Sequence, residues 1–311
     1  MNTINTIVAT GSIDGILTSA ALLRAIGNSD VAVQFTQAFT VNKVDVSAWQ
    51  PGQKVAFVDL AVNNREPQMT ADFVRRIRDA GHEIVAVCDE HNRADWLDIL
   101  GSFDGLVIEP QSQSEGVYKS SGAVLKVALG DEADEHTVML CDTADQADRM
   151  NFVGVGELTN QAVKSKIADD TRRVYLARHL ATSAEPDSTI QKWIGEYEAI
   201  LANHQDILDG KVDLGDGIVR ASSIGRVVDM TTLMKSFYDG GARVVILEGD
   251  MFDKALGRKT IQIAFGTNEK LDLLATIKVV VPQASGFAQK ANVPPEHEEV
   301  ALGAVRVLLR G

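Results

Sequence analysis

The chain has 311 residues, of which 45% are hydrophobic and 23% are charged, as in ordinary soluble globular proteins. Its formal net charge is −13, and it has no run of lysine and arginine. Proteins that bind long duplex nucleic acid usually present a basic stripe to the phosphates. The charge therefore favours a small phosphate compound over duplex nucleic acid as the partner, and the length allows two domains.

The compartment is predicted from cysteine usage and apolar runs. The two cysteines, Cys88 and Cys141, are too few for a disulfide framework. The first residues have neither a basic segment nor a long apolar segment, and no apolar run approaches the ~20 residues that span a bilayer. We therefore expect a cytoplasmic protein without a membrane partner, and we leave open whether it forms a homodimer.

Apolar runs alternate with helical patterns along the first half of the chain. Strands are predicted at 4–9, 31–35, 54–59, 83–88 and 106–108. Helices are predicted at 16–26, 67–80 and 120–129, and segment 137–141 fits either a strand or a helix. This alternation predicts an α/β fold with a parallel, doubly wound sheet.

After a polar stretch at 182–188, the second half of the chain again alternates helical patterns with apolar runs. A helix at 189–208 is followed by predicted strands and helices at 217–222, 229–238, 243–248, 260–265 and 296–309. We expect a first domain at 1–185, a linker helix at 186–210, and a second, smaller α/β domain at 211–311.

Four aspartates stand at or just after predicted strand ends. They are Asp14, Asp59, Asp89 and Asp142. Parallel sheets bind ligands beyond the carboxyl ends of their strands. Carboxylates suit hard cations such as Mg²⁺ and Mn²⁺, and gathered negative charges are tolerated when a cation neutralises them. The pattern thus predicts a metal site, although any one aspartate could instead cap a helix or close a turn.

These residues lie in segments that resemble the motifs of the DHH phosphoesterase superfamily. Residues 10–23 resemble its first motif, Val58-Asp59 its second, and Cys88-Asp89-Glu90-His91-Asn92 its Asp-His-His motif. Residues 120–123 resemble the helix start that follows, and 140–145 resemble the fourth motif. Residues 296–304 resemble the closing motif of the DHH-associated domain. The resemblance implies a divalent-metal-dependent phosphoesterase.

Two departures from the family pattern affect the implied metal sites. Ser12 replaces the leading Asp of the first motif, and Val8, Ala9 or Thr10 stands where the family has a His. One of the family's two metal-ligand sets thereby loses two of its three members. The other set maps onto oxygen ligands only, and the resemblance therefore implies one Mn²⁺ or Mg²⁺ ion held by Asp14, Asp59, Glu90 and Asp142.

The resemblance also implies roles around the metal. His91 would contact the phosphoryl group or act as general acid, and Asp89 would share the catalytic role. Ser12, Arg258 and His297 are the implied substrate-binding residues. The substrate would be a short oligonucleotide, a nucleotide phosphoester or polyphosphate.

Two alternatives remain at this stage. A catalytically impaired phosphate-binding or regulatory protein could retain the DHH fold, because fold does not carry activity with it. The aspartates could also be caps in an unrelated Rossmann-like protein. The turn at 11–15 lacks the full dinucleotide fingerprint, which disfavours a nicotinamide enzyme.

Overall fold

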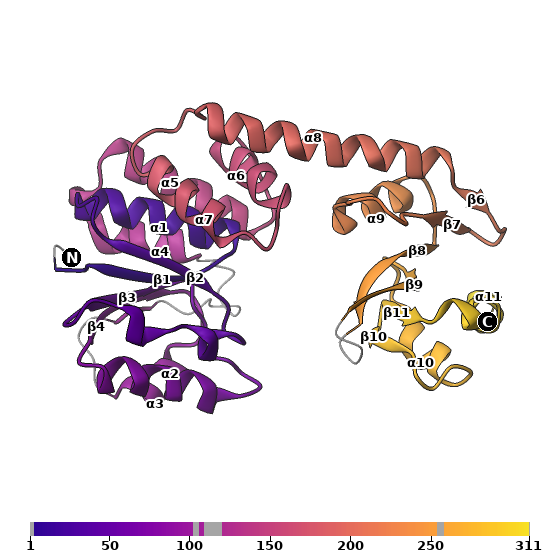
Figure 1. Ribbon diagram of the computed structural model, residues 1–311, viewed down its shortest axis with the longest axis horizontal. Coiled ribbons are helices and arrows are strands. Elements are labelled where there is room, and N and C mark those ends of the chain that lie inside the picture. The colour runs from indigo at the N-terminus through magenta and orange to yellow at the C-terminus, as the bar shows by residue number, and fades with distance from the viewer. Residues whose placement is uncertain (1–2, 102–105, 109–119, 254–257, 311) are drawn as a thin grey trace. The chain divides into compact units, whose positions relative to one another are not determined.

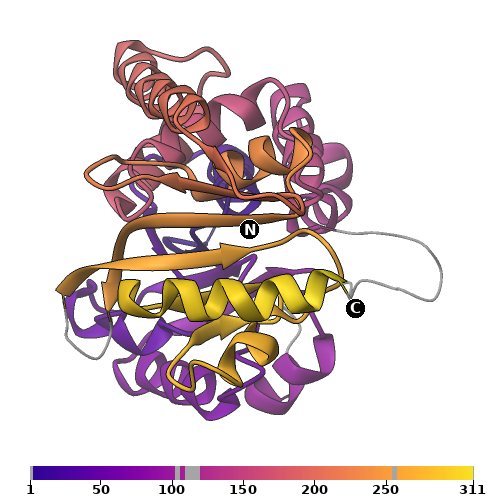
Figure 2. The same ribbon diagram turned by 90° about the vertical axis from the view of Figure 1, so that its right-hand side faces the viewer.

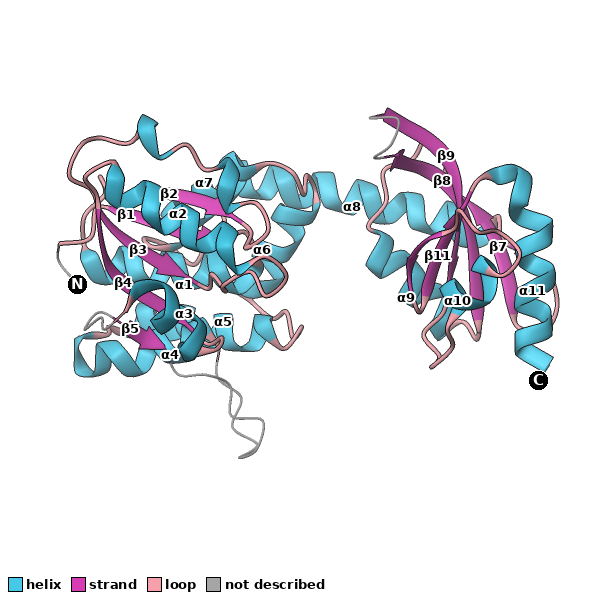
Figure 3. Ribbon diagram, turned by 90° about the horizontal axis from the view of Figure 1, so that it is seen from below, coloured by secondary structure: helices cyan, strands magenta, loops and turns pink. Residues whose placement is uncertain are grey.

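The computed structural model describes residues 3–101, 106–108, 120–253 and 258–310 (Figure 1). The chain divides into two compact units, Met1–Gly195 and Glu196–Gly311. The boundary falls within the long helix α8 (Ser188–Asp209). In both units the strands form a sheet that carries helices on its faces (Figure 3).

The first unit contains a five-stranded, fully parallel sheet with the order β2-β1-β3-β4-β5. The strands are β1 (Thr6–Thr10), β2 (Ala32–Thr36), β3 (Lys54–Val58), β4 (Glu83–Asp89) and β5 (Leu106–Ile108). The centres of β1, β3 and β4 are rich in buried apolar residues, because the interior strands of a parallel sheet are covered on both faces. The predicted fold class, α/β with a parallel doubly wound sheet, is confirmed.

Helices cover the two faces of this sheet. One face carries α1 (Ile13–Ile26), α4 (Ser121–Leu129), α5 (Glu135–Asp148), α6 (Val155–Lys164) and α7 (Asp170–Leu180). The other carries α2 (Pro67–Asp79), α3 (Arg93–Leu100) and the short turns η1 (Val41–Lys43) and η2 (Val46–Ala48). Figure 1 shows the two layers on opposite sides of the strands.

The strand order creates a switch point between β1 and β3. From β1 the chain crosses to β2 on one side, and from β3 it crosses to β4 on the other. The connections therefore diverge at the carboxyl ends of these two strands, where open α/β sheets have their ligand crevice.

The second unit contains a six-stranded mixed sheet with the order β10-β11-β9-β8-β7-β6. Its strands are β6 (Val212–Asp213), β7 (Ile218–Ser222), β8 (Val244–Asp253), β9 (Arg258–Gly266), β10 (Ser285–Phe287) and β11 (Lys290–Val293). Helix α9 (Met230–Asp239) packs on one face. The other face carries α10 (Leu273–Lys278) and α11 (Glu298–Arg310), which follows the turn η4 (Pro295–His297) (Figure 2). None of the described helices is long and apolar enough to cross a membrane.

In the first unit, sequence patterns missed the helices α3, α6 and α7. Helices α6 and α7 contact α1. Both helices bury short apolar stripes among many polar residues, so neither segment contains a long apolar run in the sequence. The ambiguous segment 137–141 is helical and belongs to α5.

Candidate active site

The turn after β1 places the first carboxylate. Ser12 caps α1, and its Oγ accepts a hydrogen bond of 3.1 Å from the Gly15 amide. Asp14 lies in the first helical turn and is buried. A Cβ atom on Gly15 would lie 2.3 Å from the Thr10 carbonyl oxygen and 2.8 Å from Oδ2 of Asp59. Only glycine therefore lets β1 turn into α1 this tightly.

Asp59 follows β3 in a conformation that non-glycine residues seldom adopt. Its φ is +51°, in the left-handed region. Its amide donates to the Cys88 carbonyl oxygen at 2.9 Å, and its own carbonyl oxygen accepts from the Thr10 hydroxyl. The Ser12 hydroxyl donates to Oδ2 at 2.6 Å. The neighbouring strands thus hold a strained backbone, as is common where a side chain is positioned for function.

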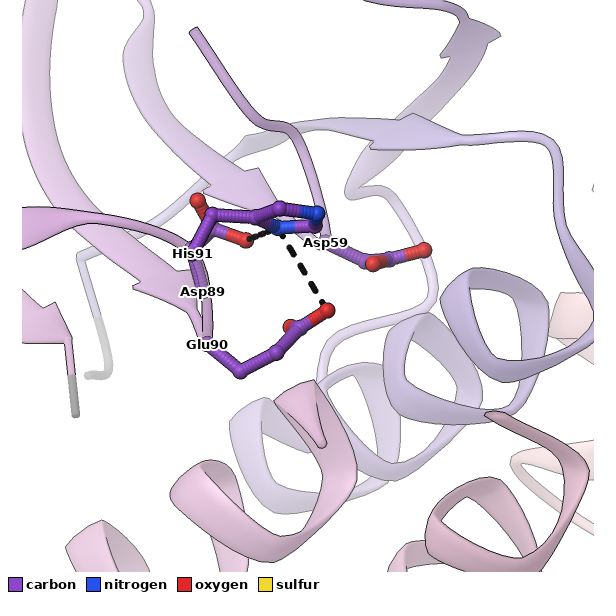
Figure 4. A group of neighbouring side chains, drawn as sticks. All are labelled: Asp59, Asp89, Glu90 and His91. Atoms are coloured by element: carbon purple, nitrogen blue, oxygen red, sulfur yellow. Dashed lines mark hydrogen bonds and ion pairs between the residues drawn. The ribbon is translucent and has the colours of Figure 1, made fainter. Parts of the chain in front are cut away.

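The last residue of β4, Asp89, and the two residues that follow it supply the next three side chains (Figure 4). Asp89 is fully buried, and its Oδ2 accepts from the indole Nε1 of Trp96 at 3.0 Å. His91 donates from Nδ1 to Oδ1 of Asp89 at 2.7 Å. Its ring is half-exposed, so Asp89 fixes the imidazole while the ring reaches the pocket.

Glu90 is the central member of the cluster. Its side chain is only 3% exposed, and Oε1 lies 3.4 Å from Nδ1 of His91. Its Oε2 is buried and has no hydrogen-bond partner among the described residues. A buried carboxylate oxygen without a partner is costly in a folded protein and indicates a missing ligand.

Two overlapping sets of ligand atoms meet at Glu90. Atoms of Asp59, Asp89, Glu90 and His91 lie within 4.8 Å of one another, and so do atoms of Asp14, Glu90 and Asp148. The cluster opens into a pocket of about 390 Å³. Its lining residues are Thr10, Ser12, Asp14, Gln37, Ala38, Phe39, Asp59, Ala61, Glu90, His91 and Asp148.

Burial and nearby negative charges raise the pKa values of Asp14, Asp59 and Glu90. Burial and the nearby Asp148 raise the pKa of Asp14 to about 6. Burial, followed by Asp14 and Glu90, holds the pKa of Asp59 well above its ordinary value. Burial and Asp89 raise the pKa of Glu90 to about 8. The folded chain therefore brings together more negative charge than it can neutralise by itself, which a divalent cation would relieve.

The raised pKa of His91 has the opposite consequence, because it favours a positive charge. Its hydrogen bond to Asp89 is the main cause that raises this pKa to about 9, despite partial burial. The imidazole is therefore cationic at neutral pH and can donate a proton or a hydrogen bond to an anionic group in the pocket.

The donor set fits a hard divalent cation. Asp14, Asp59, Glu90 and Asp148 offer carboxylate oxygens, and one buried oxygen of Glu90 lacks another described partner. Oxygen donors of this kind suit Mg²⁺ or Mn²⁺. This acidic cluster could therefore hold a metal ion.

The metal ligand predicted at Asp142 requires a correction. Asp142 lies within α5 rather than at a strand end, and its Oδ1 pairs with Nζ of Lys126 at 2.6 Å. Asp148, the last residue of α5, reaches the pocket instead. Six helical residues correspond to about 600° of rotation, so these two side chains point in different directions. The sequence shows the acid-rich stretch that contains both residues, but it does not show which of their side chains faces the pocket.

The other predicted substrate-binding residues have separate locations. Ser12 lies at the cluster, where its hydroxyl donates a hydrogen bond to Asp59. His297 ends η4 in the second unit, with its Nε2 2.5 Å from Nε2 of Gln283. Arg258 begins β9, but its side chain lies outside the described part of the structure.

Comparisons with known proteins identify the fold. Neither protein-family models nor curated protein sequences match the chain. Among solved structures, the pGpG-specific phosphodiesterase PggH from Vibrio cholerae aligns over 98% of both chains, with a TM-score of 0.63 and 12% identity. Manganese-bound RecJ from Thermus thermophilus aligns with 98% of this chain and 52% of its own, with a TM-score of 0.56 and 12% identity.

A DHH domain from a member of a family of ribosomal proteins also aligns, with a TM-score of 0.52 and 13% identity. The alignment covers 98% of this chain and 87% of that one. The molecule is thus a two-unit α/β protein with an acidic pocket at the switch point of its parallel sheet. More specifically, it has the fold of the DHH phosphoesterase superfamily.

Proposed function

We propose that the protein is a divalent-metal-dependent phosphoesterase that acts on a small phosphate substrate. The observation that carries the proposal is that Asp14, Asp59, Glu90 and Asp148 line one pocket, where Glu90 lies within ligand distance of Asp59 in one group and of Asp14 and Asp148 in another. One buried oxygen of Glu90 has no described partner. Manganese and magnesium are the preferred candidates because all four side chains are oxygen donors. A bound cation would supply polarisation of a phosphoryl oxygen and a lowered pKa for a bound water.

The chain's own residues would orient and protonate the substrate. Asp89 holds His91 by its Nδ1, and the protonated imidazole is directed to the same pocket as the acids. It would donate a hydrogen bond to the phosphoryl group or a proton to the leaving oxygen. Trp96 keeps the Asp89 carboxylate in place through its indole N–H. Asp89 is therefore a positioning residue in this proposal, and His91 is the catalytic residue.

A second candidate function is a phosphate-binding or regulatory protein with impaired catalysis. Ser12 favours this second candidate. Its hydroxyl donates a hydrogen bond to Oδ2 of Asp59, whereas the family's first motif has a carboxylate at the position of Ser12. A site with one cation lacks the paired metals that clamp the attacking and leaving oxygens together.

One assay separates the two candidates. The full chain is incubated with Mn²⁺ and bis-para-nitrophenyl phosphate beside the Asp59→Asn variant, with phosphate binding measured in parallel. Turnover above that of the variant supports the phosphoesterase. Binding of phosphate without turnover supports the second candidate and rejects the first.

A further inference from the structure

An aromatic side chain stands exposed at the mouth of the acidic pocket. Phe39 is 67% exposed, yet it lines the pocket together with Glu90 and His91. Single exposed apolar residues are common on protein surfaces and need no explanation in themselves. Phe39 differs because it lines the acidic pocket.

The turn that carries Phe39 is firmly built. The Thr40 amide donates to the Gln37 carbonyl oxygen at 2.8 Å, and the Gln37 amide donates to Oγ1 of Thr40 at 3.1 Å. Oγ1 of Thr36, at the end of β2, lies 3.2 Å from Oγ1 of Thr40. These bonds close a turn of four residues at the edge of the sheet. Phe39 is therefore presented by an ordered turn, and its ring does not fold back into the core.

A second groove is also lined by residues of this turn. It has a volume of about 490 Å³ and shares Gln37 with the acidic pocket. Gly11, between the pocket residues Thr10 and Ser12, forms part of its wall, and Lys43 contributes a cationic side chain. Both volumes lie in the range of ~300–1,000 Å³ typical of ligand sites. The two cavities together offer room for a substrate that extends beyond its reacting phosphate.

We infer that Phe39 is a stacking platform for a nucleobase, and that the substrate is a short nucleotide phosphodiester rather than inorganic polyphosphate. The inference rests on the proposed function, since it places the scissile phosphate at the acidic cluster. A flat base can stack on an exposed aromatic ring, and such stacking tolerates different bases. The adjoining groove then receives the remainder of the nucleotide, with Lys43 near its backbone charge.

The test removes the aromatic ring of Phe39 from the protein and, separately, an adenine base from the substrate. Phe39→Ala and Phe39→Trp are compared with wild type on 5′-phosphorylated diadenylate and on analogues with one or the other adenine absent. Phe287→Ala is the matched control, because Phe287 is also an exposed phenylalanine, at 60%, but lies in the second unit. Binding is measured in parallel by calorimetry with Mn²⁺ and a phosphorothioate-linked diadenylate, which resists hydrolysis.

We expect Phe39→Ala to raise KM and Kd for the diadenylate roughly 5- to 100-fold, as loss of one base–aromatic stack predicts. One of the two abasic analogues should lose this dependence on Phe39, Phe39→Trp should bind at least as tightly as wild type, and Phe287→Ala should be unchanged. Equal losses on the diadenylate and on both abasic analogues, or no loss at all, would overturn the inference.

The same experiment distinguishes failure of the inference from failure of the proposed function. If wild type and Phe39→Ala turn over diadenylate equally well, the stacking platform is rejected and the phosphoesterase is supported. Binding that depends on Phe39 without any turnover rejects the phosphoesterase and keeps the stacking platform. A wild-type chain that neither binds nor cleaves diadenylate overturns both.

Discussion

The hydroxyl of Ser12 lies 2.6 Å from Oδ2 of Asp59, across 47 residues of sequence, and donates a hydrogen bond to it. The same Oγ accepts a hydrogen bond from the Gly15 amide, so Ser12 both caps α1 and occupies one oxygen of the buried acid. A carboxylate at position 12 would instead add a further negative charge beside Asp59. The serine therefore places a neutral hydrogen-bond donor, rather than a further carboxylate, beside Asp59.

The two aspartates of α5 give the sharpest test of the metal ligands. Asp148→Asn should weaken Mn²⁺ binding roughly tenfold or more, because it removes one oxygen of the set around Glu90. Asp142→Asn is the matched control and should leave affinity unchanged, because Asp142 pairs with Lys126. Calorimetric titration of both variants checks the prediction. The opposite order of effects would restore Asp142 as the ligand.

The pKa of Glu90 predicts how stability without metal depends on pH. This pKa rises from an ordinary 4.5 to about 8 in the folded chain, so the folded state holds more protons than the unfolded state between these values. The stability contributed by Glu90 is therefore highest at low pH and falls as the pH rises toward 8. Asp14 and Asp59 act in the same direction.

Glu90→Gln should remove part of this dependence. In chelator at pH 8.5 we expect the variant to exceed wild type by about 1–4 kcal/mol in free energy of unfolding, with the difference shrinking toward pH 5. Saturating Mn²⁺ should reverse the order, because only wild type retains the full ligand set. Urea unfolding measures both effects. The exposed Glu157→Gln is the control and should follow the wild-type curve.

The tight turn after β1 predicts a steric penalty at Gly15. In Gly15→Ala the new methyl group would meet the Thr10 carbonyl oxygen, Oδ2 of Asp59 and Oγ of Ser12. We expect a loss of about 1–3 kcal/mol in the free energy of unfolding, together with weaker Mn²⁺ binding. Gly303→Ala, in open space within α11, should instead stabilise by about 0.5–1 kcal/mol. Equal stability of the two variants would contradict the packing described for Gly15.

The hydrogen bond between Asp89 and His91 predicts the charge state of the imidazole. Asp89→Asn should lower the pKa of His91 from about 9 toward its ordinary 6.5, because it removes the main cause of the shift. At pH 8 the imidazole would change from mostly cationic to mostly neutral. NMR titration of the metal-free chain measures this pKa. Asp98→Asn, at an exposed position of α3, serves as the control and should leave it unchanged.

Sequence patterns placed the strands of the first sheet well because their signal is local. A run such as Lys54–Val58 is apolar, β-branched or aromatic, and bounded by turn residues, and it forms β3 at that position. Helix α1 was predicted at 16–26 and ends before Gly27, at φ +68°, as expected, but it begins earlier, at Ile13, after its cap Ser12. Helices α6 and α7 were missed because their burial depends on α1, which a local window does not contain.

The sequence by itself determined that Asp14, Asp59 and Asp89 stand near one edge, since parallel strands end together and side chains at or just after their ends share that edge. Only the tertiary structure decided that Asp148 rather than Asp142 joins them, because the direction of a side chain on a helix depends on how that helix packs. It also decided that Ser12 binds Asp59 and that Phe39 borders the pocket. Those relations join distant segments, and distances between such segments are set by the packing of the whole unit.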